Sequence, residues 1–117
     1  QIVLKDSTTY FEVYNNVKLY DIPSLGDNVY LEISYKCDDV MTVGIYAYYD
    51  YGSNIVQTPI MRCNPTDEWK KVYVYMTNTI ANYFSADSFR IYLSGGSIAE
   101  ETTERKEFYI DNLKLLY

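Results

Sequence analysis

Apolar and polar residues alternate along most of the chain, and this pattern predicts an all-β protein. Successive side chains of an extended strand point to opposite faces, so every second residue shares a face. No long stretch shows the apolar spacing of an amphipathic helix. We therefore expect strands at residues 2–5, 10–14, 17–20, 29–37, 41–49, 55–62, 69–77, 88–94 and 107–117.

Turn-forming residues separate the predicted strands. Asn15-Asn16 and Asn64-Pro65 are typical of tight turns, and Gly95-Gly96 follows the strand that begins at Ser88. One helical turn is expected between residues 78 and 87. Short strands at this spacing predict a β-sandwich or a barrel.

Sorting the strand residues by face separates an apolar set from a set rich in tyrosine. The apolar set is expected to form the core and consists of Val29, Leu31, Ile33 and Tyr35; Val43, Ile45, Ala47 and Tyr49; Val72, Val74 and Met76; and Phe89, Ile91 and Leu93. The opposite faces carry tyrosine where charged residues and threonine are usual, at Tyr30, Tyr46, Tyr48, Tyr73, Tyr75 and Tyr92.

These outward tyrosines admit two interpretations. Exposed tyrosines make a rigid contact surface, because each has a flat apolar ring and a hydroxyl that donates and accepts hydrogen bonds. Sugars suit such a surface, since their C–H faces stack on the rings. Alternatively, the tyrosines only stabilise the sheet, because cross-strand aromatic pairs contribute roughly 0.2 to 1 kcal/mol each. Their number favours a binding surface, unless a neighbouring domain covers it.

The single tryptophan lies where a strand is predicted to begin, within Glu68-Trp69-Lys70. A ligand contact through its indole ring is one interpretation. Large aromatic side chains at such positions commonly close the end of a sandwich core. We therefore expect Trp69 to be structural.

Composition and charge narrow the function classes. The chain of 117 residues is expected to be a single domain, 1–117, excised from a larger polypeptide, since a predicted strand begins directly after Gln1. No apolar run approaches the roughly 18 residues of a membrane span, so membrane insertion is not expected. The net charge of −6, with scattered basic residues, disfavours a nucleic-acid partner.

Two cysteines, Cys37 and Cys63, lie at the ends of predicted strands. Their spacing fits one disulfide across neighbouring strands but no metal motif. The alternative is two small buried residues, which is how free cysteine usually behaves. A disulfide would place the chain outside the cytosol.

The residues give no support to catalysis. The chain has no histidine, which excludes Ser-His-Asp and Cys-His nucleophiles. Its acidic residues lie mostly in predicted loops, and nothing marks a tuned carboxylate pair. Gly95-Gly96 lacks the lysine and the helix of a phosphate-binding loop. We expect a protein that is not an enzyme.

Three segments resemble the last strands of bacterial carbohydrate-binding modules with a β-jelly-roll fold, of the galactose-binding-like group. They are DEWKKVYVYMT at 67–77, FRIYLSGG at 89–96 and EFYIDNLKLLY at 107–117. In that group a tryptophan opens a strand, a later strand ends in a small-residue turn, and the terminal strand carries an aromatic residue followed by Ile-Asp. The resemblance implies an antiparallel jelly-roll sandwich without a required cofactor.

The same resemblance implies a structural calcium ion. Members of the group hold it with an aspartate of the terminal strand and an acidic residue of an early strand, which correspond here to Asp111 and Glu12. Calcium prefers several carboxylate and carbonyl oxygens. The Gly-rich opening of the group is absent from this chain.

Two functions are therefore expected from the sequence. The first is non-catalytic binding of a polysaccharide or oligosaccharide by a secreted or cell-surface bacterial protein. Its candidate residues are Tyr46, Tyr48, Tyr73, Tyr75 and Tyr92 as stacking platforms, with Arg90 and Gln57 as polar contacts. The alternative is a structural or adhesive domain that contacts neighbouring domains of its parent protein, with a terminal strand near Gln1 pairing with a sheet edge.

Overall fold

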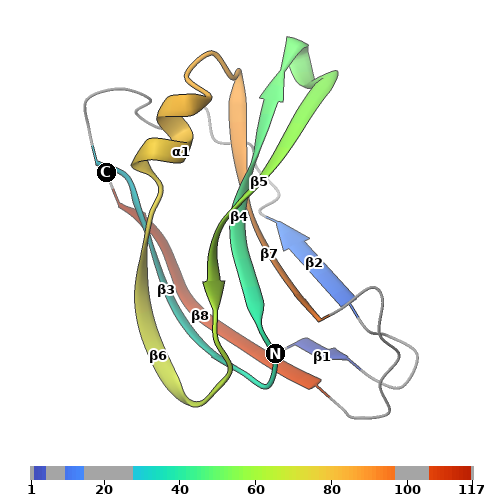
Figure 1. Ribbon diagram of the computed structural model, residues 1–117, viewed down its shortest axis with the longest axis vertical. Helices are drawn as coiled ribbons and strands as arrows, with labels where there is room; N and C mark the ends of the chain where they lie inside the picture. Colours follow the sequence, from blue (N-terminus) through green and yellow to red (C-terminus); the bar gives the residue numbers. More distant parts are fainter. Residues whose placement is uncertain (1, 5–9, 15–27, 97–105, 117) are drawn as a thin grey trace.

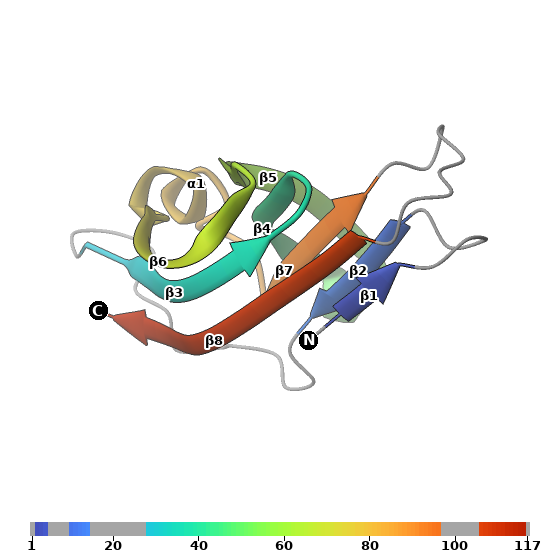
Figure 2. The same ribbon diagram turned by 90° about the horizontal axis from the view of Figure 1, so that it is seen from below.

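The computed structural model describes residues 2–4, 10–14, 28–96 and 106–116. Within these ranges the chain forms a sandwich of two four-stranded antiparallel sheets (Figures 1 and 2). Sheet I has the strand order β1-β8-β3-β6, with β1 (Ile2–Leu4), β8 (Lys106–Leu116), β3 (Tyr30–Cys37) and β6 (Thr66–Tyr75). Sheet II has the order β2-β7-β4-β5, with β2 (Tyr10–Tyr14), β7 (Ser88–Gly96), β4 (Met41–Tyr49) and β5 (Asn54–Cys63).

The chain changes sheets between strands that follow one another in sequence. It leaves sheet I after Cys37 and begins β4 of sheet II at Met41. It returns to sheet I between Cys63 and Thr66. Strands with the same alternating pattern therefore belong to opposite layers of the sandwich.

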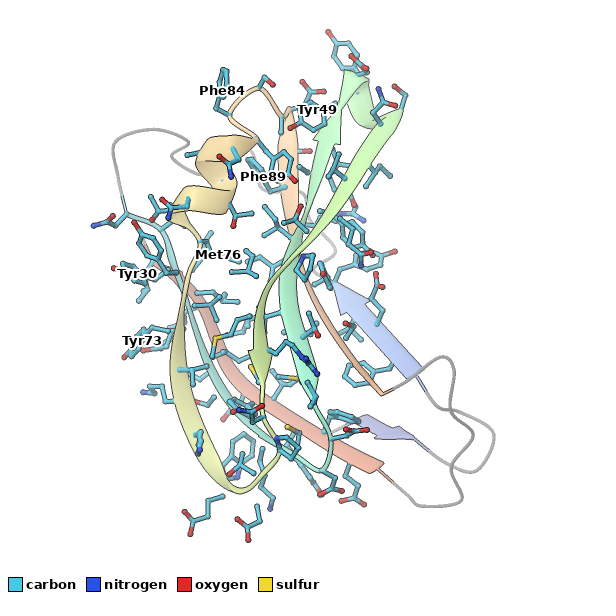
Figure 3. All side chains as sticks on the ribbon, in the orientation of Figure 1. Tyr30, Tyr49, Tyr73, Met76, Phe84 and Phe89 are labelled. Atoms are coloured by element: carbon cyan, nitrogen blue, oxygen red, sulfur yellow. The ribbon has the colours of Figure 1, made fainter. Side chains whose placement is uncertain are left out.

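The core lies between the two inner faces. The side chains of Met76 and Phe89 lie between the sheets, whereas Tyr30 and Tyr73 project from sheet I away from sheet II (Figure 3). The predicted core residues are buried there, apart from Tyr49 and Val72, which are half-buried and pack against it. Phe108 of β8 and Met41 add fully buried side chains.

The predicted all-β sandwich with antiparallel sheets is confirmed, and its jelly-roll connectivity stays a prediction. The expected helical turn is present as α1 (Thr77–Asn82), which buries Ile80 at one end of the sandwich. A short 3-10 turn, η1 (Asp50–Gly52), joins β4 to β5. β6 begins at Thr66, earlier than predicted. The strand predicted at 17–20 lies outside the described residues.

Candidate functional site

The predicted tyrosine platform is divided between the two sheets. Tyr46 and Tyr48 lie on β4 and Tyr92 on β7 of sheet II, whereas Tyr73 and Tyr75 lie on β6 of sheet I. The outer faces of a sandwich point in opposite directions. The five tyrosines therefore do not form one surface; among the described residues they belong to two separate aromatic surfaces.

The first surface is the tyrosine cluster of sheet II, formed by Tyr14, Tyr46, Tyr48 and Tyr92. The ring centroid of Tyr46 lies 6.2 Å from that of Tyr14, 6.4 Å from that of Tyr48 and 5.1 Å from that of Tyr92. These distances are typical of favourable aromatic pairs. Tyr14, which was not among the predicted site residues, belongs to this cluster.

The two predicted polar contacts also lie on this face. Arg90 and Gln57 are the register partners of Tyr46 on its two neighbouring strands. The guanidinium of Arg90 lies 5.1 Å from the ring centroid of Tyr14 and 5.6 Å from that of Tyr48. Both distances are within the range of cation–π contacts. The structure thus brings together Tyr46, Tyr48, Tyr92, Arg90 and Gln57.

Hydrogen bonds fix the exposed edge of the tyrosine cluster. The hydroxyl of Tyr46 donates to Oε1 of Glu12 on β2. Nε2 of Gln57 donates to the Tyr46 hydroxyl at 3.1 Å and to Oε2 of Glu12 at 3.4 Å. The polar groups of these three side chains are thus already engaged with one another.

Two of the three predicted platform rings on this sheet are covered. Tyr92 is 3% exposed and Tyr48 is 8% exposed. Tyr92 lies against Gly44 of the neighbouring strand, where the absence of a side chain leaves room for its ring. A sugar can stack only on a ring face that solvent reaches. Within the cluster, Tyr14 and Tyr46 are the more accessible rings.

The second surface is the β6 aromatic row, formed by Trp69, Tyr73 and Tyr75 on the outer face of sheet I. Their exposed fractions are 53%, 55% and 43%. They lie at alternate positions with Lys71 between Trp69 and Tyr73, so all four point to one side of the strand. Six residues of extended chain separate the end members by about 20 Å. The row is therefore a long and open aromatic surface.

Trp69 does not close the core, and this corrects the sequence-based expectation. Its ring packs edge-on against Tyr109 of β8, with 6.2 Å between the centroids. The pairing of β3 with β6 shifts register between Tyr35 and Cys37, opposite the segment that carries Trp69. β6 begins before the tryptophan, so Trp69 is a surface residue within the strand.

Neighbouring strands support both ends of the β6 aromatic row. Tyr30 of β3 pairs with Tyr75, and their ring centroids are 5.3 Å apart. At the other end, Nζ of Lys36 lies 5.1 Å from the centroid of Tyr109. These contacts restrict the motion of the rings, so less side-chain entropy would be lost when a ligand binds.

A buried carboxylate holds the centre of the row. Glu32 of β3 is 9% exposed. Its Oε1 accepts a hydrogen bond from the Tyr73 hydroxyl, and its Oε2 accepts one from Nδ2 of Asn112, each at 2.9 Å. Asn112 has a φ of 54°, at the point where the pairing of β3 with β8 shifts register. The register shift in β8 thus occurs at the residue whose side chain donates to the Glu32 carboxylate.

Charge and hydrogen bonding act together on Glu32. The hydrogen bond from Tyr73 lowers the pKa of the carboxyl group most strongly, and Lys71, Asn112 and Lys114 lower it further, while burial acts in the opposite direction. The same hydrogen bond raises the pKa of the Tyr73 hydroxyl. At neutral pH the carboxylate is therefore ionised and fixes the ring of Tyr73.

The residues expected to hold calcium lie on different sheets. Glu12 is on the outer face of sheet II, and Asp111 is on β8 of sheet I, where its Oδ1 accepts the backbone N–H of Asn112. The structure therefore does not bring these two carboxylates together, and a structural calcium ion stays a prediction. Within the described part of the chain, no three Asp, Glu, Cys or His side chains are grouped closely enough to hold a metal ion.

Cys37 and Cys63 are both buried free thiols. They lie on β3 and β5, which belong to different sheets and are not neighbouring strands as expected. Sγ of Cys37 is 3.8 Å from the carbonyl oxygen of Asn64, the residue after Cys63. A disulfide between them stays a prediction, and it would join the two layers.

An apolar cavity of about 170 Å³ opens between β2, β7 and β8. Its lining consists of Val13, Tyr14, Ile91, Leu93 and Leu113. Sugar recognition needs several directed polar groups. This cavity therefore does not suit a sugar.

No protein-family model matches the chain, and no curated protein matches its sequence. In the ranges that the structure describes, no helix is long and apolar enough to cross a membrane. The candidate site therefore rests on its own geometry.

Proposed function

We propose that this chain is a non-catalytic polysaccharide-binding domain and that the glycan lies along the β6 aromatic row. The observation that carries the proposal is the alignment of Trp69, Tyr73 and Tyr75, each about half exposed, along one strand. An extended glycan presents one sugar face after another, and aligned rings match that repetition. The length of the row, about 20 Å, suits several sugar units.

The proposed site lies on sheet I, whereas most of the residues predicted to contact a sugar lie on sheet II. Tyr73 and Tyr75 remain platform residues, and Trp69 joins them. Tyr48 and Tyr92 have too little exposed ring surface to stack on a sugar. The tyrosine cluster instead suits a contact with a neighbouring domain of the parent protein. Under the same proposal the domain has a jelly-roll topology and works in a secreted or cell-surface bacterial protein.

Affinity electrophoresis in gels that contain soluble polysaccharides tests the proposal. The expected affinity is millimolar to micromolar, which corresponds to roughly 4 to 8 kcal/mol. W69A and Y75A should each weaken binding, because each removes one stacking ring. The matched control is Y51A, which removes a fully exposed tyrosine from the tip between β4 and β5. Retardation that is equal in wild type, W69A and Y75A would refute this site.

Exposed residues of β5 favour a second candidate function, a structural or adhesive contact with another protein. β5 is an edge strand of sheet II, and among its ten residues only Arg62 is charged. Ile55 and Val56 are exposed on it. The unpaired backbone groups of an edge strand can pair with a further strand, here on either side of Pro59. Concentration-dependent assembly that I55K abolishes would support this alternative.

A further inference from the structure

Two ammonium groups share one carboxylate at the centre of the β6 aromatic row. Nζ of Lys71 on β6 lies 4.0 Å from Oε1 of Glu32, and Nζ of Lys114 on β8 lies 4.0 Å from Oε2. The lysines thus approach the carboxylate from opposite sides. Among these three side chains the lysines carry one more positive charge than Glu32 balances, and Asp111 of β8, the register partner of Ser34, adds a carboxylate to the same sheet.

The hydrogen-bond donors of both lysines are available to a ligand. At 4.0 Å an ammonium group is too far from a carboxylate oxygen to donate a hydrogen bond to it. Tyr73 and Asn112 supply the hydrogen bonds that Glu32 accepts. In the part of the chain that the structure describes, no hydrogen bond uses Nζ of Lys71 or Lys114.

Both lysines are also accessible from solvent. Their side chains are 52% and 61% exposed, whereas the side chain of Glu32 is 12% exposed. A ligand that reaches this point therefore meets the two ammonium groups before it meets the carboxylate. Lys71 lies between Trp69 and Tyr73 on the strand, so a glycan stacked on both rings passes directly over it.

We propose that the glycan bound along β6 is an acidic polysaccharide, whose carboxylate or sulfate groups accept hydrogen bonds from Lys71 and Lys114. The inference rests on the proposed function. An anionic group of the ligand accepts hydrogen bonds from two ammonium groups whose donors no described protein group uses. Hydrogen bonds between charged groups are about twice as strong as those between neutral groups.

The chain as a whole is negatively charged, and this helps to separate specific from unspecific binding of an acidic polymer. A net charge of −6 repels polyanions in general. Binding of an acidic polymer therefore requires specific local contacts and cannot arise from a basic protein surface. Exposed ion pairs weaken as salt concentration rises, whereas ring stacking does not.

Affinity electrophoresis with paired polymers tests the inference. The acidic polymers are polygalacturonate, which carries carboxylates, and dextran sulfate; the neutral counterparts are carboxyl-reduced polygalacturonate and dextran. We expect wild type to be retarded by at least one acidic polymer and much less by its neutral counterpart. K71Q/K114Q should lose about tenfold in affinity for that polymer, which corresponds to about 1.4 kcal/mol.

The matched control is R62Q/K70Q, which removes the same charge from an exposed position on β5 and from the side of β6 opposite to the row. It should bind within about twofold of wild type, which is less than 0.5 kcal/mol. Retardation by polygalacturonate alone assigns the anionic group to a carboxylate, and retardation by dextran sulfate alone assigns it to a sulfate ester.

Three results would overturn the inference. Equal binding of acidic and neutral polymers that still depends on Trp69 would refute it while the proposed function stands. Equal losses of affinity in K71Q/K114Q and R62Q/K70Q would show that Lys71 and Lys114 do not contact the ligand. Failure of all four polymers to retard wild type refutes the acidic ligand, and retardation by other, neutral glycans that W69A abolishes would then still support the proposed function.

Discussion

The ring of Tyr92 occupies the space that a side chain at Gly44 would need. A β-carbon added to Gly44 would lie 2.5 Å from Cε1 of Tyr92 and 2.4 Å from the backbone oxygen of Thr58. Gly44 and Tyr92 are register partners on β4 and β7. A glycine in a strand is weakening by itself, and a cross-strand aromatic ring that covers it compensates for the missing side chain.

Gly44→Ala should therefore destabilise the sandwich. Overpacking of this kind costs about 1 to 3 kcal/mol, and the backbone of Thr58 cannot turn away as a side chain can. Urea unfolding followed by tryptophan fluorescence measures the loss. Ser34→Ala, at an outward position of sheet I, is the control and should change stability by less than about 0.5 kcal/mol. A Gly44→Ala protein as stable as wild type would contradict this packing.

Glu32→Gln should remove part of the pH dependence of stability. The pKa of Glu32 is lower in the folded chain than its ordinary value of 4.5, chiefly through the hydrogen bond from Tyr73. Its contribution to stability is therefore present above pH 4.5 and is lost as the pH falls through the folded-state pKa. Melting temperatures of wild type should fall more steeply below pH 4.5 than those of the variant. Glu68→Gln, at an exposed position, should follow wild type.

In the reduced protein, the two cysteines should react slowly with thiol reagents as long as the chain is folded. Burial and the neighbouring Cys37 raise the pKa of the Cys63 thiol to about 11, and burial also raises the pKa of Cys37. Little thiolate is present at pH 8, and the thiolate is the reactive form. Mass spectrometry after maleimide treatment should find unmodified protein without denaturant and two adducts in urea. Rapid labelling of the native protein would show that the thiols are accessible.

Trp69→Ala should leave the fold almost intact. The indole is half exposed, so its loss should cost less than about 1 kcal/mol. Phe108→Ala is the contrast, because Phe108 is fully buried and its truncation should cost about 3 to 5 kcal/mol. Thermal unfolding followed by circular dichroism compares the two. A large loss in Trp69→Ala would return the tryptophan to a structural role.

The alternation of side chains predicted the fold and the sidedness of its strands because both depend on local geometry. Leu31, Ile33, Val43 and Ile45 point inward as expected. Alternation has a period of two in every strand and carries no information about the layer to which a strand belongs. Tyr46 and Tyr75 were therefore placed on one surface, although the chain changes sheets between them.

The site was harder to predict than the fold. Trp69 shares the alternate positions of Lys71, Tyr73 and Tyr75, so alternation alone places its ring on the outer face. It was missed because the strand was predicted to begin at Trp69 and not at Thr66. Tyr14 is the last residue of the strand predicted at residues 10–14. Its neighbours in the tyrosine cluster, however, come from β4 and β7, which are distant in sequence. The lysines near Glu32 come from two strands that are far apart in the chain.

The two aromatic surfaces lie on opposite outer faces of the sandwich, so under the proposed function attachment and recognition would use different faces. A parent protein that docks against Tyr14 and Tyr46 would leave β6 turned outward, toward whatever lies beyond the assembly. Neither contact would then obstruct the other. A domain with two opposite contact faces could hold a larger protein on a polymer without a conformational change.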